Sequence, residues 1–129
     1  MNKTLGKTLI GLGIVSCALY YCVQTNVRMF FVITGSMEPL IPARSLVISK
    51  KINAEEVKTG KVIIFNDQNN KRVTAHRVME TKESGYVTRG DANEYQDRFR
   101  VQPTDIIGAV IGVFPLGNFV TISLQMVFL

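Results

Sequence analysis

The chain has 129 residues, enough for one small domain, and 47% of them are hydrophobic. Its formal net charge is +5 at pH 7. The basic residues form neither a Lys/Arg run nor a patch interleaved with aromatic residues, so the charge does not indicate a nucleic-acid partner. The only two cysteines, Cys17 and Cys22, are spaced so that they do not share a helix face, and no disulfide framework is predicted.

The first predicted element is a membrane-spanning helix. No charged residue occurs in residues 8–26, a window of about 28 Å as a helix, which approaches the roughly 30 Å hydrocarbon core of a bilayer. Lys3 and Lys7 precede it, and the positive-inside rule then puts the N-terminus in the cytoplasm. A cleaved signal peptide has a similar start. No small-x-small cleavage site follows Ala18, so a retained anchor is predicted.

Short segments rich in β-branched residues follow the helix and are typical of strands. Turn-rich residues 67–70 and 83–85 indicate hairpin loops, and only residues 54–58 suggest a helical turn. The predicted fold class is therefore mainly β, a single antiparallel β-rich domain with an N-terminal transmembrane helix. The predicted strands are 29–34, 45–50, 61–66, 71–80, 86–89 and 106–114.

The chain divides on this basis into a cytoplasmic N-terminus (1–7), a transmembrane anchor (8–26), an extracytoplasmic domain (27–118) and a short apolar tail (119–129). The tail is about 16 Å long as a helix, too short to span a bilayer alone. Three placements stay open for it: at the membrane surface, packed on the anchor, or as the stub of a longer segment.

Ser36 and His76 are the candidate nucleophile and base. Ser36 ends the first predicted strand, and Gly35 before it permits a sharp turn. Most Gly-Ser pairs are ordinary turns, and a lone histidine is more often structural than catalytic. A serine nucleophile nevertheless needs a base, and His76 is the only histidine in the chain. One histidine in a domain without cysteine does not predict a metal site.

Asp91 and Asp97 are the candidates for an acid that would orient His76. Both lie in the segment RGDANEYQD, residues 89–97. Either could instead bond to its own backbone in a turn. The Arg-Gly-Asp tripeptide is short enough to occur by chance and is not taken as an adhesion motif. The residues alone leave the choice between the two acids open.

Four segments occur in order along the chain, GSMEPLIP (35–42), VKTGKVIIF (57–65), TAHRV (74–78) and TRGDANEYQD (88–97), and IIGAVIGVFPLG (106–117) follows them. In this order the four segments resemble the boxes of the type I signal peptidase family (S26), and the fifth resembles the last stretch of that pattern. The similarity covers about residues 28–118 and the anchor. Histidine at position 76, where the bacterial housekeeping enzymes have lysine, resembles the endoplasmic-reticulum, archaeal and sporulation-type branch. The chain departs from the family at Ala43-Arg44, where Gly-Asp is usual, and this is expected to alter a turn rather than the chemistry.

The resemblance implies a signal-peptidase-like catalytic domain with Ser36 as nucleophile and His76 as base. Asp91 and Asp97 both match acids of the family pattern. The hydroxyl of Thr34 and the backbone N–H of Ser36 are the implied oxyanion hole.

The implied activity is that of signal peptidase I, a membrane-bound serine endopeptidase that removes signal peptides from secreted preproteins after small-x-small sites. No metal or cofactor is expected. The implied partners are secretory preproteins and the lipid membrane, with the secretion translocon as a further candidate and no nucleic acid. The expected location is the cell membrane, in a single pass.

Two alternative functions are compatible with the same β scaffold. A soluble self-cleaving repressor-type peptidase would use a Ser-Lys pair, and the anchor and His76 disfavour it. A catalytically inactive, membrane-tethered binding or assembly module would not need Ser36, His76 and an acid together.

Overall fold

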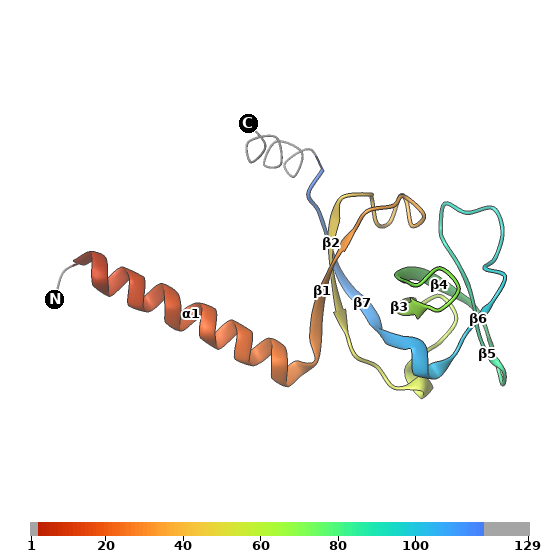
Figure 1. Ribbon diagram of the computed structural model, residues 1–129, viewed down its shortest axis with the longest axis horizontal. Helices are drawn as coiled ribbons and strands as arrows, with labels where there is room; N and C mark the ends of the chain where they lie inside the picture. The colour runs from red at the N-terminus through yellow and green to blue at the C-terminus, as the bar shows by residue number, and fades with distance from the viewer. Residues whose placement is uncertain (1–2, 118–129) are drawn as a thin grey trace.

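The computed structural model describes residues 3–117, in which a long helix leads into one seven-stranded antiparallel sheet (Figure 1). The mainly antiparallel β fold with an N-terminal apolar helix is confirmed. The predicted apolar tail, residues 119–129, lies outside the described residues.

Helix α1 (Lys3–Thr25) extends away from the sheet, and none of its side chains is buried. Its 23 residues have a mean hydropathy of 1.5 over the most apolar window, so it is long and apolar enough to cross a membrane. Asn26 adopts a left-handed backbone conformation (φ 54°) directly after the helix. The chain then turns into the first strand.

The strands are arranged in the order β1-β2-β7-β3-β4-β5-β6. Two one-turn 3-10 helices, η1 (Ala54–Glu56) and η2 (Pro103–Asp105), connect them. All six predicted strands are present, and the sequence missed only the two-residue β6. The bounds are β1 (Val27–Val32), β2 (Ser45–Lys50), β3 (Val62–Asp67), β4 (Arg72–Lys82), β5 (Gly85–Arg89), β6 (Arg100–Val101) and β7 (Ile106–Pro115).

Strand β3 lies at the centre of the core because both of its faces are buried. Successive side chains of a strand point to opposite faces, and Val62 and Ile64 pack into a cluster that contains Met37. Ile63 and Phe65 pack into a second cluster on the other side. The first cluster supports the segment that carries Ser36.

Among residues 3–117, strand β1 and the first half of strand β4 each have an unpaired backbone edge, as does the terminal strand β6 on the far side of the sheet. Strand β1 lies at the edge of the sheet and, among the described strands, pairs only with β2. Strand β4 pairs with β3 along Arg72–Arg77 but with β5 only from Arg77 onward. Residues 72–76 therefore have one backbone edge that no described strand occupies.

Arg44 occupies the turn before β2 in a left-handed backbone conformation (φ 63°). Its N–H donates to Val32 O (2.8 Å), and its carbonyl accepts from Leu116 N–H (3.1 Å). The departure from the family pattern therefore falls in a turn that ties the end of β1 to the end of β7.

Candidate active site

Ser36 lies in a compact turn after β1, residues 35–41, called here the nucleophile turn. Glu38 N–H donates to Gly35 O (3.1 Å), and Ile41 N–H donates to Met37 O (2.9 Å). Met37 is 1% exposed and Ile41 is 0% exposed. These two side chains anchor the turn in the core, while Ser36 stays half-buried at the surface of a groove.

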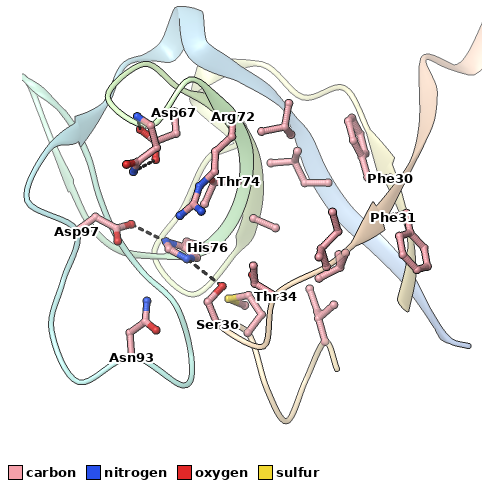
Figure 2. A pocket seen from close by; sticks show the side chains of 18 of the residues that line it. Phe30, Phe31, Thr34, Ser36, Asp67, Arg72, Thr74, His76, Asn93 and Asp97 are labelled. Atoms are coloured by element: carbon pink, nitrogen blue, oxygen red, sulfur yellow. Dashed lines mark hydrogen bonds and ion pairs between the residues drawn. The ribbon is translucent and has the colours of Figure 1, made fainter. Parts of the chain in front are cut away.

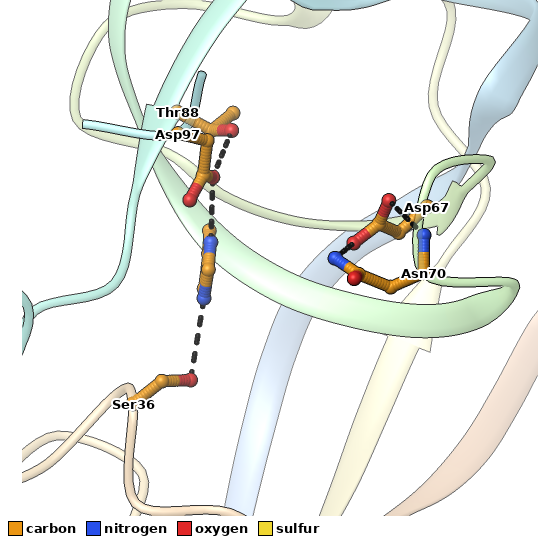
Figure 3. A network of polar contacts seen from close by, with 6 residues as sticks. Ser36, Asp67, Asn70, Thr88 and Asp97 are labelled. Atoms are coloured by element: carbon orange, nitrogen blue, oxygen red, sulfur yellow. Dashed lines mark hydrogen bonds and ion pairs between the residues drawn. The ribbon is translucent and has the colours of Figure 1, made fainter. Parts of the chain in front are cut away.

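His76 links Ser36 to Asp97 (Figures 2 and 3). The imidazole Nδ1 lies 2.7 Å from Asp97 Oδ2, and Nε2 lies 3.2 Å from Ser36 Oγ. An ionised carboxylate can only accept hydrogen bonds, so Nδ1–H donates to Asp97. In the neutral ring Nε2 is then left as an acceptor for the Ser36 hydroxyl. His76 is 6% exposed, and its ring contacts the edge of Phe65.

Asp97 is held by Thr88 of β5, a residue that the sequence interpretation missed. Thr88 Oγ1–H donates to Asp97 Oδ2 (2.6 Å), and Asp97 N–H donates to Thr88 O (2.8 Å). Thr88 is fully buried. A threonine in a short apolar strand could have indicated this role. A buried hydroxyl requires a hydrogen-bond partner, and a nearby carboxylate is one such partner.

Asp91 bonds to Arg77 instead of His76. The contact is bidentate, with Arg77 Nε–H donating to Oδ1 (2.8 Å) and Nη2–H to Oδ2 (2.6 Å). These hydrogen bonds lower the pKa of the Asp91 carboxyl, and the charges of Arg77, Arg89 and His76 act in the same direction. Of the two acids that the sequence left open, the structure brings Asp97 into contact with the imidazole.

The segment from 90 to 97, called here the acid loop, also contacts the nucleophile turn through the backbone. Ala92 N–H donates to Ser36 O (2.9 Å), and Asn93 N–H donates to Gly90 O (3.0 Å). Gly90 packs so closely that a Cβ built on it would lie 2.5 Å from Ser36 O. The loop that carries Asp97 is therefore held directly against the backbone of Ser36.

No family model matches the chain, but catalytic subunits of signal peptidase complexes do. The subunit SEC11 of Metarhizium robertsii is 32% identical over 106 residues, which is 73% of this chain and 62% of that protein. The Sclerotinia sclerotiorum subunit is 30% identical with the same coverage, and human SEC11C is 27% identical over 73% of this chain and 55% of its own length. This chain is a homologue of the signal peptidase catalytic subunits. It spans about three fifths of the fungal relatives, and the predicted family resemblance is confirmed.

The groove of this signal peptidase homologue has a volume of about 540 Å³ and lies between β1 and β4. Phe30 and Phe31 lie on the side of the groove away from His76. Arg72 and Thr74 precede His76 on β4 and line the opposite side (Figure 2). The hydroxyl of Thr74 is buried and has no hydrogen-bond partner among the described residues. The groove thus has one apolar wall and one wall that carries polar groups.

Thr34, the other predicted oxyanion-hole residue, lines the same groove and is exposed. Within residues 3–117, neither the Thr34 hydroxyl nor the Ser36 N–H donates a hydrogen bond to another residue. No group of three or more His, Cys, Asp or Glu side chains in the same range could hold a metal ion.

Proposed function

We propose that this protein is a membrane-bound serine endopeptidase that removes N-terminal signal peptides from secreted preproteins. The observation that carries the proposal is the hydrogen-bonded series Ser36–His76–Asp97 at the wall of a groove. The homology to proteins named as catalytic subunits of signal peptidase complexes supports it.

In the proposed reaction, Ser36 Oγ attacks the carbonyl carbon of the scissile peptide bond as its proton passes to His76 Nε2. The C–N bond then breaks, and the proton moves from Nε2 to the leaving amine. A water molecule, deprotonated by the same nitrogen, attacks the acyl-enzyme. The ester C–O bond then breaks, and the proton returns from Nε2 to Ser36 Oγ as the new carboxylate product leaves. Asp97 keeps Nδ1 protonated and stabilises the imidazolium that forms in each half of the reaction.

Two unengaged donors are suited to the oxyanion of the tetrahedral intermediate. They are the Ser36 N–H and the Thr34 hydroxyl, which donate to no residue within 3–117, and both residues line the groove. Removing one such donor costs about 3 kcal/mol of transition-state stabilisation in comparable sites. Thr34→Val is therefore expected to lower kcat much more than it raises KM.

The substrate is proposed to bind as an extended strand. The edges of β1 and of residues 72–76 of β4 that are unpaired within residues 3–117 border the groove. Exposed edges pair with extended peptides through backbone hydrogen bonds. Phe30, Val32 and Ile64 line the groove and favour apolar substrate side chains. The preference for small residues beside the cleaved bond is inferred from the resemblance to the signal peptidase family.

The anchor is proposed to hold the domain at the membrane from which preproteins emerge. Helix α1 supports a single pass, and Lys3 and Lys7 favour a cytoplasmic N-terminus with residues 27–118 on the opposite side. The membrane would be the cell membrane in a cell without internal membranes and the endoplasmic reticulum in a eukaryote. The secretion translocon is a candidate neighbour, and protease protection in sealed vesicles tests the orientation.

The test uses the full chain in lipid vesicles with a preprotein substrate and sequencing of the new N-terminus. Ser36→Ala and His76→Ala are each expected to abolish cleavage, whereas the exposed hairpin variant Ser84→Ala serves as the control. Normal cleavage by Ser36→Ala would refute the proposal. A wild-type protein that neither cleaves preproteins nor reacts with serine-directed acylating probes would instead be a binding or assembly module.

A further inference from the structure

We propose that Thr88 is a positioning residue that fixes the carboxylate of Asp97 and, through it, the imidazole of His76. The catalytic consequence rests on the proposed peptidase function, but the contact itself does not. Thr88 would act on the reaction without touching substrate, because it is fully buried and does not line the groove.

Two hydrogen bonds in opposite directions connect Thr88 and Asp97. The hydroxyl donates to the Asp97 carboxylate (2.6 Å), and the Asp97 N–H donates to the Thr88 carbonyl (2.8 Å). The pair closes the base of the acid loop, so both the backbone and the side chain of Asp97 are fixed to one residue of β5. Figure 3 shows Thr88 beside Asp97, at the end of the series opposite Ser36.

Both donors to the Asp97 side chain reach the same oxygen. Oδ2 accepts from Thr88 Oγ1–H and from His76 Nδ1–H, and within residues 3–117 the carboxylate has no other hydrogen-bond partner. A carboxylate with a single partner rotates about its Cβ–Cγ bond, because torsions of this kind are broad. The Thr88 hydroxyl removes that freedom and keeps Oδ2 directed at the imidazole.

The strand pairing makes Thr88 a rigid reference point for His76. Thr88 lies opposite Val78 in the β4–β5 ladder, two residues beyond His76 on the same strand. Base and acid are therefore attached to neighbouring strands, and the position of the acid relative to the base is set by the sheet. Preorganised groups of this kind lower the cost of reaching the reactive geometry.

The kinetic test compares Thr88→Val, which keeps the shape of the side chain and removes the hydroxyl, with Thr88→Ser, which keeps the hydroxyl. Valine suits a buried strand, so Thr88→Val is expected to fold. We expect Thr88→Val to lower kcat by about 10- to 100-fold, the range for a hydrogen bond to a charged group, with KM unchanged. Thr88→Ser is expected to stay within about threefold of wild type.

A second comparison asks whether Thr88 acts through Asp97. In an Asp97→Ala background, Thr88→Val is expected to lower kcat by less than about twofold, because coupled residues are not additive. A full additional loss in that background would overturn the proposal, since Thr88 would then act by another route.

NMR of the imidazole gives a readout that does not depend on activity, because His76 is the only histidine in the chain. The Nδ1–H proton that is hydrogen-bonded to Asp97 should resonate far downfield in wild type and in Thr88→Ser, and broaden or move upfield in Thr88→Val. Unchanged imidazole signals in Thr88→Val would overturn the positioning role. A wild-type protein that shows the expected signals but cleaves no preprotein would refute the peptidase function alone.

Discussion

Replacement of Gly90 by alanine tests whether the acid loop sets the position of the nucleophile. A Cβ at position 90 would lie 2.5 Å from Ser36 O, about 0.9 Å short of ordinary contact at 3.4 Å, and 2.7 Å from Asn93 Nδ2. The Asn93 side chain can rotate away, but the Ser36 carbonyl belongs to the backbone. That carbonyl is also bonded to Ala92 N–H (2.9 Å). The nucleophile turn and the acid loop must therefore move apart by most of the shortfall of about 0.9 Å.

A separation of that size is large compared with the tolerance of the site. Ser36 Oγ is already 3.2 Å from His76 Nε2, the upper limit for a nucleophile and its base. A displacement of about 1 Å costs about 100-fold in rate, and overpacking costs about 1–3 kcal/mol of stability. We expect Gly90→Ala to lower kcat/KM by about two orders of magnitude and to unfold at a lower temperature than wild type.

The assay is cleavage of a preprotein by the full chain in lipid vesicles, with thermal unfolding followed in parallel. Gly112→Ala in β7 is the matched control, because a Cβ at Gly112 would make only ordinary contacts, the nearest at 3.7 Å. The control should retain activity and stability. If Gly90→Ala kept kcat/KM within about threefold of wild type, the loop would not hold Ser36 in place.

Three further predictions concern the two acids and the β3–β4 turn. Asp97→Asn is expected to lower kcat by up to about 10⁴-fold, as an amide does at the acid position of a Ser-His-Asp triad, and Asp91→Asn by much less; the reverse ranking in a cleavage assay would make Asp91 the orienting acid. Because the pKa of Asp91 is lowered in the folded protein, its pair with Arg77 stabilises the fold above the ordinary carboxyl pKa of about 3.9. That stability is lost as the pH falls through the folded value, so thermal unfolding between about pH 5 and 2 should show a steeper decline in wild type than in Asp91→Asn. Lys71 has a left-handed backbone (φ 50°), and Lys71→Gly should raise the unfolding free energy by about 1 kcal/mol without loss of activity. A variant that unfolds more easily than wild type would contradict this prediction.

The fold was predictable because its elements carry strong local signals. The uncharged N-terminal segment predicted α1, and β-branched runs predicted the strands of the core. Strand β6 was missed because two residues are too few to show the alternation of apolar and polar side chains that identifies a strand. Strand β1 begins and ends two residues earlier than predicted, since the backbone turn at Asn26 starts the strand directly after the helix.

The site was predictable only in part, because the choice between the two acids depends on how side chains are arranged in space. Ser36 and His76 are 40 residues apart, and their motifs indicated both. Asp91 and Asp97 occupy one loop, and no local pattern says which carboxylate faces the imidazole. The choice depends on Arg77, which follows His76 on β4 and points to the other side, where it binds Asp91. Because Asp91 forms an ion pair with Arg77, Asp97 is the acid of the loop that contacts His76.

The acid loop contacts three residues from distant parts of the chain, Ser36, Arg77 and Thr88. The acid loop carries Asp97, its Ala92 N–H holds the carbonyl of Ser36, and Asp91 binds the residue next to the base. Each contact joins the loop to a different partner: the nucleophile turn, strand β4 and strand β5. A change at any of these contacts therefore alters the position of the acid relative to both Ser36 and His76. For this reason kcat is expected to respond to variants of buried loop contacts that never meet the substrate, with KM as the insensitive parameter.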